Sequence, residues 1–160
     1  MQLFVSIAVV VAAAALGSIF TARSVRGWYT GLKKPPFTPP GPVFGPVWTF
    51  LYLCMAASVY LVWQEGLRTA GVLTAFILFW VQLAFNVSWS AVFFGMKSSR
   101  GGLAVIAILW LLILATILAS FRVAVWAGIL LIPYIVWVSL AAYLNTGIWY
   151  LNRKNSPPVT

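Results

Sequence analysis

Residues 28–52 read WYTGLKKPPFTPPGPVFGPVWTFLY, and this stretch decides the fold. Prolines at 35, 36, 39, 40 and 42 exclude a helix or a central strand across these eight positions, because proline lacks the N–H group and clashes with the preceding turn. The stretch is nevertheless too apolar and aromatic for a solvated linker, and long hydrophobic runs flank it. It predicts a stiff loop between membrane helices that acts as a lid over a cavity. The predicted lid residues are Trp28, Pro35, Pro36, Phe37, Pro39 and Pro40.

Composition predicts a membrane protein. Hydrophobic residues make up 63% of the 160 residues and charged residues 7%, whereas a soluble domain has about 25% charged residues. Five charge-free stretches reach the roughly 20 residues that a spanning helix needs, and the alternation of barrel strands is absent. We therefore expect an all-α integral membrane protein, a single domain over 1–160 in which five transmembrane helices form a bundle. The expected ranges are 2–21, 43–64, 70–95, 102–121 and 123–151, with the lid loop at 22–42.

Two features inside these stretches refine the prediction. The first stretch lacks the basic start of a cleaved signal peptide and exceeds the usual apolar run of about 7–15 residues, so we expect it to persist as a helix. Pro133 lies inside the fifth stretch, where proline kinks a helix. A kink there is expected to widen the cavity near Trp137.

The basic residues predict an orientation. The first loop, the third loop and the C-terminal tail, which share one side of a five-helix protein, hold eight of the ten Lys and Arg residues. They are Arg23, Arg26, Lys33, Lys34, Lys97, Arg100, Arg153 and Lys154, against Arg68 and Arg122 on the other side. The positive-inside rule then places the first loop and the C-terminus in the cytoplasm. Attraction to anionic headgroups accounts for the net charge of +9 without a nucleic-acid partner, and the sequence does not name the membrane.

The missing residue types restrict the chemistry. The chain has no His and one acidic residue, Glu65, and Cys54 is its only cysteine. Carboxylate pairs, Ser-His-Asp sites and zinc or calcium sites therefore cannot be assembled within one chain. Cys54 is interpreted as a packing residue. We expect no metal, no required cofactor and no acid–base catalysis, so chemistry has to come from a bound ligand or from the 9 Trp and 6 Tyr side chains.

Helical periodicity gathers the aromatic and amide residues on two faces. One face holds Phe79, Gln82, Asn86, Trp89 and Phe93, and the other holds Tyr134, Trp137, Ala141 and Asn145. Trp48 and Tyr52 are neighbours at i and i+4. Amides in a membrane need partners, so they either tie helices together or line a cavity. We interpret Asn86 as a cavity residue, and for Gln82 and Asn145 both alternatives stay open.

These motifs resemble the TspO/MBR family, which comprises the tryptophan-rich sensory proteins and the translocator proteins. The resemblance covers about residues 26–150. It rests on the proline-rich loop, on Gln82-Leu83-Ala84-Phe85-Asn86 with Trp89 and Phe93-Phe94-Gly95, and on Pro133-Tyr134 with Trp137 and Leu144-Asn145. The resemblance implies a ligand site inside the bundle beneath the first loop, formed by Tyr29, Trp48, Asn86, Trp89, Phe93 and Trp137. The face that carries Tyr134, Ala141 and Asn145 extends this set.

The resemblance implies a receptor or transporter that binds porphyrins, such as protoporphyrin or haem precursors, and other flat apolar ligands. A regulatory or stress-sensing role in tetrapyrrole metabolism follows from it. One alternative is a light- and oxygen-dependent enzyme that degrades porphyrin, with Trp48 and Trp137 as its photochemical residues. Another is a structural membrane partner protein.

The expected partners are porphyrins, other apolar small molecules and the lipid bilayer. Sterol binding is not favoured, because the family's Leu-Asn-Tyr becomes Leu144-Asn145-Thr146 here. The small-residue pairs Ala13-xxx-Gly17 and Ala91-xxx-Gly95 permit close helix packing or a homodimer, and we expect a homodimer.

Overall fold

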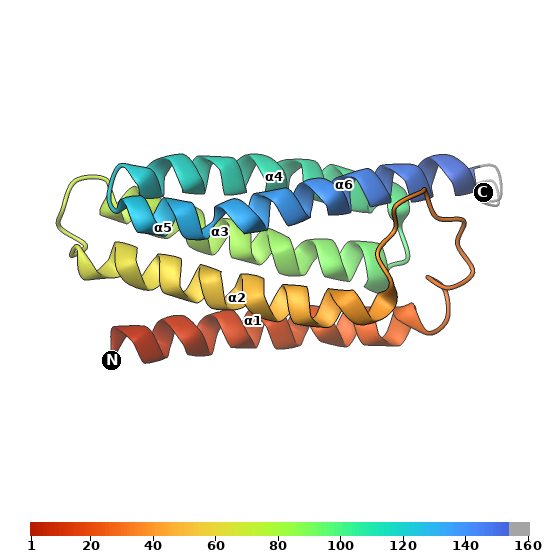
Figure 1. The fold of residues 1–160 in the computed structure, drawn as a ribbon, viewed down its shortest axis with the longest axis horizontal. Helices are drawn as coiled ribbons and strands as arrows, with labels where there is room; N and C mark the ends of the chain where they lie inside the picture. Colours follow the sequence, from red (N-terminus) through yellow and green to blue (C-terminus); the bar gives the residue numbers. More distant parts are fainter. Residues whose placement is uncertain (154–160) are drawn as a thin grey trace.

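Long helices run side by side along the whole length of the molecule (Figure 1). The computed structural model describes residues 1–153, so Lys154 of the predicted basic tail lies outside the described residues. In chain order the elements are α1 Gln2–Val25, α2 Gly41–Gln64, α3 Val72–Ser90, the π-helical turn η1 Ala91–Gly95, α4 Ser99–Phe121, α5 Val125–Leu130 and α6 Ile132–Asn152.

The predicted five-helix membrane bundle is confirmed. Within residues 1–153, five helical segments are long and apolar enough to cross a membrane, since α3 continues into η1 and α5 into α6. Large apolar side chains such as Leu53, Leu111 and Val136 lie about 60% exposed on the outside of the bundle (59%, 61% and 64%), where a bilayer would cover them. The chain is therefore a multi-pass integral membrane protein.

Two helix ends differ from the predicted ranges by three residues or more, and the other ends differ by two residues or fewer. Helix α1 continues to Val25, so the loop that follows it begins at residue 26 and not at residue 22. Helix α4 begins at Ser99 and not at residue 102, because the Ser98 side chain accepts a hydrogen bond from the Gly101 N–H and caps the helix. This serine cap supplies a partner for an N–H group that has none within the helix.

The fifth span is interrupted just before Pro133, where a kink was predicted, but Trp137 does not line the cavity that the kink was expected to widen. Helix α5 ends at Leu130 and α6 begins at Ile132, with Leu131 between them. The Leu131 N–H donates to the Gly128 carbonyl, so the Ala127 carbonyl loses the partner four residues ahead. Ser58 of α2 donates to that carbonyl over 2.8 Å. A neighbouring helix thus satisfies the backbone where the proline interrupts the ladder.

The π-helical turn η1 was not predicted from the sequence. In this turn the Met96 N–H donates to the carbonyl of Ala91, five residues earlier. The wider turn allows the consecutive residues Phe93 and Phe94 both to be buried, which an α-helical spacing of 100° per residue does not favour. The Ser24 hydroxyl of α1 donates to the Phe94 carbonyl and supplies a partner at this helix end.

Small residues bring α1 close to α3 and η1. Ala13 is buried, and a Cβ atom placed on Gly17 would lie 3.5 Å from the Ser90 hydroxyl of α3. A Cβ atom placed on Gly95 would lie 2.9 Å from the Phe20 ring. Ala13, Gly17 and Gly95 therefore serve packing within one chain. The homodimer stays a prediction.

The basic segments gather at one end of the bundle. The first loop, the α3–α4 connection and the end of α6 lie at this end, and the N-terminus lies at the other (Figure 1). The Asn152 side chain of α6 accepts from the Lys33 N–H (3.1 Å) and donates to the Lys33 carbonyl (2.9 Å), which joins the first loop to α6 directly. We name this end of the molecule the basic end.

The arrangement predicts the outcome of cysteine-accessibility labelling in whole cells. In a Cys54→Ala background, cysteines at positions 33 and 153 should react from the same face of the membrane, and a cysteine at position 68 from the other. The reason is that the first loop and the end of α6 lie at the basic end, and the α2–α3 connection, which carries position 68, lies at the opposite end (Figure 1). Labelling of positions 33 and 153 from opposite faces would contradict the fold.

Candidate ligand-binding site

Asn86 lies at the centre of a hydrogen-bonded group that joins three helices. Its Oδ1 atom accepts from the Tyr52 hydroxyl of α2 (3.0 Å), and its Nδ2 atom donates to the Tyr134 hydroxyl of α6 (2.9 Å). Trp48 stacks on Tyr52 with 5.4 Å between the ring centroids and meets Tyr134 edge-on at 6.4 Å. This group ties α2, α3 and α6 together, so Asn86 has the structural role that the sequence left as the alternative.

Asn145 anchors a second group nearer the basic end. Its Oδ1 atom accepts from the Trp89 indole N–H (3.2 Å), and its Nδ2 atom donates to the Ser99 carbonyl of α4 (2.7 Å). A Cβ atom placed on Gly102 would lie 2.7 Å from Asn145 Oδ1, so only glycine fits there. Trp89, held in this way, stacks on Phe93 at 5.4 Å.

The start of the first loop covers the Trp89–Phe93 pair. Trp28 meets Phe93 edge-on at 5.6 Å, and Tyr29 lies 5.7 Å from the Phe94 ring. The Lys34 ammonium group lies 4.7 Å from the centre of the Tyr29 ring, within cation–π range. Burial raises the pKa of the Tyr29 phenol above 10.0, so the phenol stays neutral at physiological pH.

Few contacts hold the rest of the loop against α6. Besides the Lys33–Asn152 pair, the Tyr143 hydroxyl donates to the Pro36 carbonyl over 3.2 Å. Pro35 is buried against Gly147, where a Cβ atom would lie 2.6 Å from the proline ring. Thr38 donates to the Pro35 carbonyl within the loop.

The remaining predicted lid residues do not close the site. Phe37 is 88% exposed and its φ of 61° turns the chain sharply at the tip of the loop. Pro36 is exposed, Pro39 is half-buried, and Pro40 stands directly before α2 as its N-cap. The prediction that Phe37 helps to cover the cavity is therefore wrong for this structure.

A small aromatic cavity lies beneath the loop. Its volume is about 30 Å³, whereas sites for drug-sized ligands enclose roughly 300–1,000 Å³. The aromatic side chains fill their own site, so this is a closed arrangement. The lining residues are Tyr29, Phe44, Trp89, Phe93, Phe94, Ala141, Leu144, Asn145 and Ile148.

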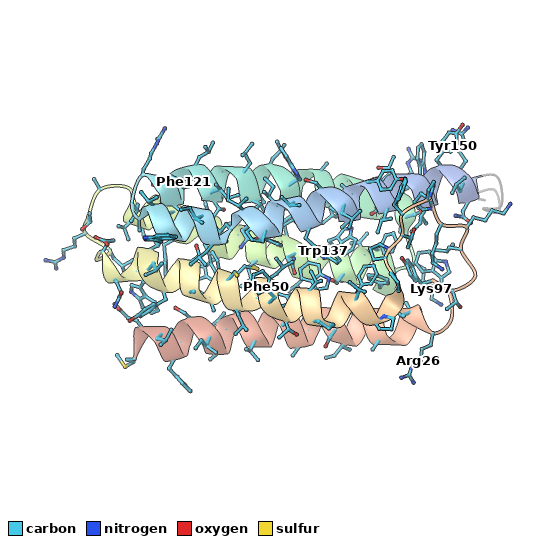
Figure 2. All side chains as sticks on the ribbon, viewed as in Figure 1. Arg26, Phe50, Lys97, Phe121, Trp137 and Tyr150 are labelled. Atoms are coloured by element: carbon cyan, nitrogen blue, oxygen red, sulfur yellow. The ribbon has the colours of Figure 1, made fainter. Side chains whose placement is uncertain are left out.

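The predicted site residues divide between the cavity and the group around Asn86. Tyr29, Trp89, Phe93, Ala141 and Asn145 line the cavity. Trp48, Asn86, Tyr134 and Trp137 do not line it, although Trp137 meets the lining residue Phe44 edge-on at 5.6 Å. Figure 2 shows Trp137 within the bundle.

Sequence reasoning missed Phe44, Phe94, Leu144 and Ile148 as lining residues. Phe44 could have been found, because it stands four residues before Trp48 on the same helix face. Phe94 could not, since its inward position depends on the π-helical turn. The described part of the chain brings no three His, Cys, Asp or Glu side chains together to hold a metal ion.

Gln82 differs from the other buried amides. It is 1% exposed, and neither its amide nitrogen nor its amide oxygen has a hydrogen-bond partner within residues 1–153. It shares the buried face of α3 with Asn86 and Trp89, as periodicity predicted. Of the two alternatives left open for Gln82, a direct tie between helices is not observed.

Comparison with known proteins gives consistent matches over almost the whole chain. Residues 5–151 match the model of the TspO/MBR family. The chain is 44% identical over 136 residues to the tryptophan-rich protein TspO of Chlorobaculum tepidum, covering 85% of this chain and 86% of that protein. It is 39% identical over 152 residues to the protein of the same name from Archaeoglobus fulgidus (95% and 97% covered). It is 37% identical over 146 residues to the human translocator protein (88% and 86% covered).

The two buried amides of α3 predict opposite mutational effects. Asn86→Leu should lower the free energy of unfolding by about 1–3 kcal/mol, because it leaves the Tyr52 and Tyr134 hydroxyls without their partner. Gln82→Leu should leave stability unchanged or raise it, because it removes an amide that has no protein partner. Thermal unfolding of both variants in the same detergent measures the difference. Equal losses from both variants would contradict this assignment.

Proposed function

Because the chain belongs to the TspO/MBR family, we propose that it is a membrane receptor that binds porphyrins and other flat apolar ligands beneath its first loop. Relatives named tryptophan-rich protein and translocator protein support a sensory or receptor role in the family. The proposed biological role is regulation or stress sensing in tetrapyrrole metabolism. The stacked Trp89–Phe93 pair under a loop that carries Trp28 and Tyr29 is the observation that supports the proposal.

The chemistry of the site suits a flat, largely apolar ligand. Aromatic rings attract one another in stacked and edge-on arrangements, and both occur around Phe93. A ligand that enters between the loop and α3 would exchange these ring contacts for contacts with its own π surface. The Trp89 indole N–H is already donated to Asn145 Oδ1, and this oxygen keeps a second lone pair that could accept from a ligand.

Binding requires the first loop to lift from α6. The closed cavity is far smaller than a porphyrin, and few contacts hold the loop against α6: the Lys33–Asn152 pair, the Tyr143–Pro36 hydrogen bond and the packing of Pro35 on Gly147. A hydrogen bond contributes about 0.5–1.5 kcal/mol, so lifting the loop costs a few kcal/mol. Proline stiffens the loop and limits the entropy that it loses when it closes again over a ligand.

Loop movement would also allow the protein to report ligand binding to a partner. The loop forms part of the surface at the basic end, together with the end of α6. A ligand that favours the lifted loop shifts the balance between two surfaces at that end. A partner that distinguishes the two surfaces would then read porphyrin occupancy.

Light-dependent degradation of porphyrin is the second candidate function. Here oxygen is the oxidant and the excited porphyrin is oxidised, so no acid or base from the protein is needed. The stack of Trp48 on Tyr52, 5.4 Å between centroids, favours this candidate because two oxidisable rings lie in contact. A structural role as a membrane partner protein is the third candidate. The hydrogen bonds by which Asn86 and Asn145 join helices are compatible with this role as well as with ligand binding.

A protoporphyrin titration in darkness tests the binding proposal. Tyr29→Ala and Trp48→Ala should each weaken affinity by up to about tenfold, because an aromatic pair contributes roughly 0.5–1.5 kcal/mol. Tyr60→Ala and Trp110→Ala are matched controls, since these residues bond Gln64 and Ser139 away from the cavity. Parental affinity in all four variants would place the porphyrin site elsewhere.

Illumination of the same samples separates the receptor from the enzyme. If the second candidate holds, bound protoporphyrin should lose its absorption under light and oxygen and yield a product that free protoporphyrin does not. Trp48→Phe and Trp137→Phe should slow that product more than they weaken binding, because phenylalanine keeps the ring contact and resists oxidation. Bleaching at the same rate with and without the protein would leave the receptor alone.

A further inference from the structure

A second hollow lies on the outside of the bundle, between the end of α1 and η1. Its volume is about 420 Å³, more than ten times that of the aromatic cavity. None of the residues that line the aromatic cavity takes part in it. The lining residues are Phe20, Ser24, Ala91, Gly95, Met96 and Lys97, and we name this hollow the α1–η1 groove.

The end of the π-helical turn shapes the groove. Gly95 lets the Phe20 ring approach the backbone, and the Ser24 hydroxyl is bound to the Phe94 carbonyl. Lys97 follows the turn with φ 54°, a left-handed conformation that ends the helix. Met96 is 72% exposed. The groove therefore combines an apolar floor with a lysine at its edge.

The position of the groove points to the headgroup level of a membrane. It lies at the basic end, and Figure 2 shows Lys97 and Arg26 there. Basic groups between transmembrane helices at the membrane surface attract anionic lipid headgroups. Apolar side chains beside them offer a surface for an acyl chain.

We propose that the α1–η1 groove binds an anionic phospholipid. Its phosphate pairs with the Lys97 ammonium group, and its acyl chain lies against Phe20 and Met96. The site is distinct from the aromatic cavity, and the inference does not depend on porphyrin binding.

The charges of the chain favour lipid over a second copy of the protein as the occupant. The only acidic side chain in the sequence is Glu65, which follows α2 at the end of the bundle opposite Lys97. A second copy in parallel orientation would therefore bring its own basic end to the groove and no carboxylate side chain for Lys97. An anionic phospholipid supplies both the negative charge and the apolar chain.

Lipid-dependent unfolding of the full-length protein in neutral detergent tests the proposal. Phosphatidylglycerol added at increasing concentration should raise the melting temperature of the parent protein with a saturable midpoint, and phosphatidylcholine of the same chain length should not. Lys97→Gln should raise that midpoint about fivefold, as expected for the loss of one cation at an anionic surface. Arg100→Gln is the matched control, because it removes the same charge three residues away and Arg100 does not line the groove.

Two further variants complete the test. Ala91→Leu keeps every charge and fills the groove, so it should also raise the phosphatidylglycerol midpoint. Lys97→Arg should restore parental behaviour. Equal shifts in Lys97→Gln and Arg100→Gln would show diffuse attraction to the basic end and would overturn the proposal. A parental midpoint in Lys97→Gln, or equal stabilisation by both lipids, would overturn it as well.

Discussion

The absence of water from a bilayer governs this structure, because polar groups inside the bundle have to find most of their partners within the protein itself. Asn86 and Asn145 meet this requirement by joining helices that are far apart in sequence, through Tyr52 and Tyr134 in one case and through Trp89 and Ser99 in the other. These bonds also fix the rotation of α2, α3 and α6 about their axes. The aromatic side chains that form the candidate site are therefore positioned by polar contacts rather than by apolar packing alone.

The same constraint explains where the helices are irregular. Serines of neighbouring helices supply the missing donor at both irregular points: Ser58 at the Ala127 carbonyl near the proline break, and Ser24 at the Phe94 carbonyl of the π-helical turn. Each irregular point has a structural consequence. The π-helical turn buries two consecutive phenylalanines on one side and shapes the α1–η1 groove on the other. A local change in helical geometry thus builds parts of two separate sites.

The sequence predicted the features that depend on period and length. Five apolar runs predicted five spans, and the spacing of Phe79, Asn86 and Phe93 predicted a buried face that runs along α3 and η1. It did not predict the features that depend on particular partners. The bonds of Asn86 to two tyrosines, the π-helical turn and the outward position of Phe37 follow from three-dimensional packing, which periodicity does not contain. Because periodicity does not contain this packing, it also did not predict that four of the proposed site residues do not line the cavity.

The closed cavity has a consequence for how a receptor of this kind would respond. In the closed state the rings of Trp28 and Tyr29 both contact the Phe93 ring, and a flat ligand would replace those contacts with similar ones. The two states then differ little in total contact energy, so the observed affinity equals the intrinsic affinity scaled by the fraction of molecules whose loop is lifted. Contacts at the rim, such as Lys33 with Asn152, set that fraction without touching the ligand. Affinity can therefore be tuned at the basic end while the aromatic interior stays unchanged.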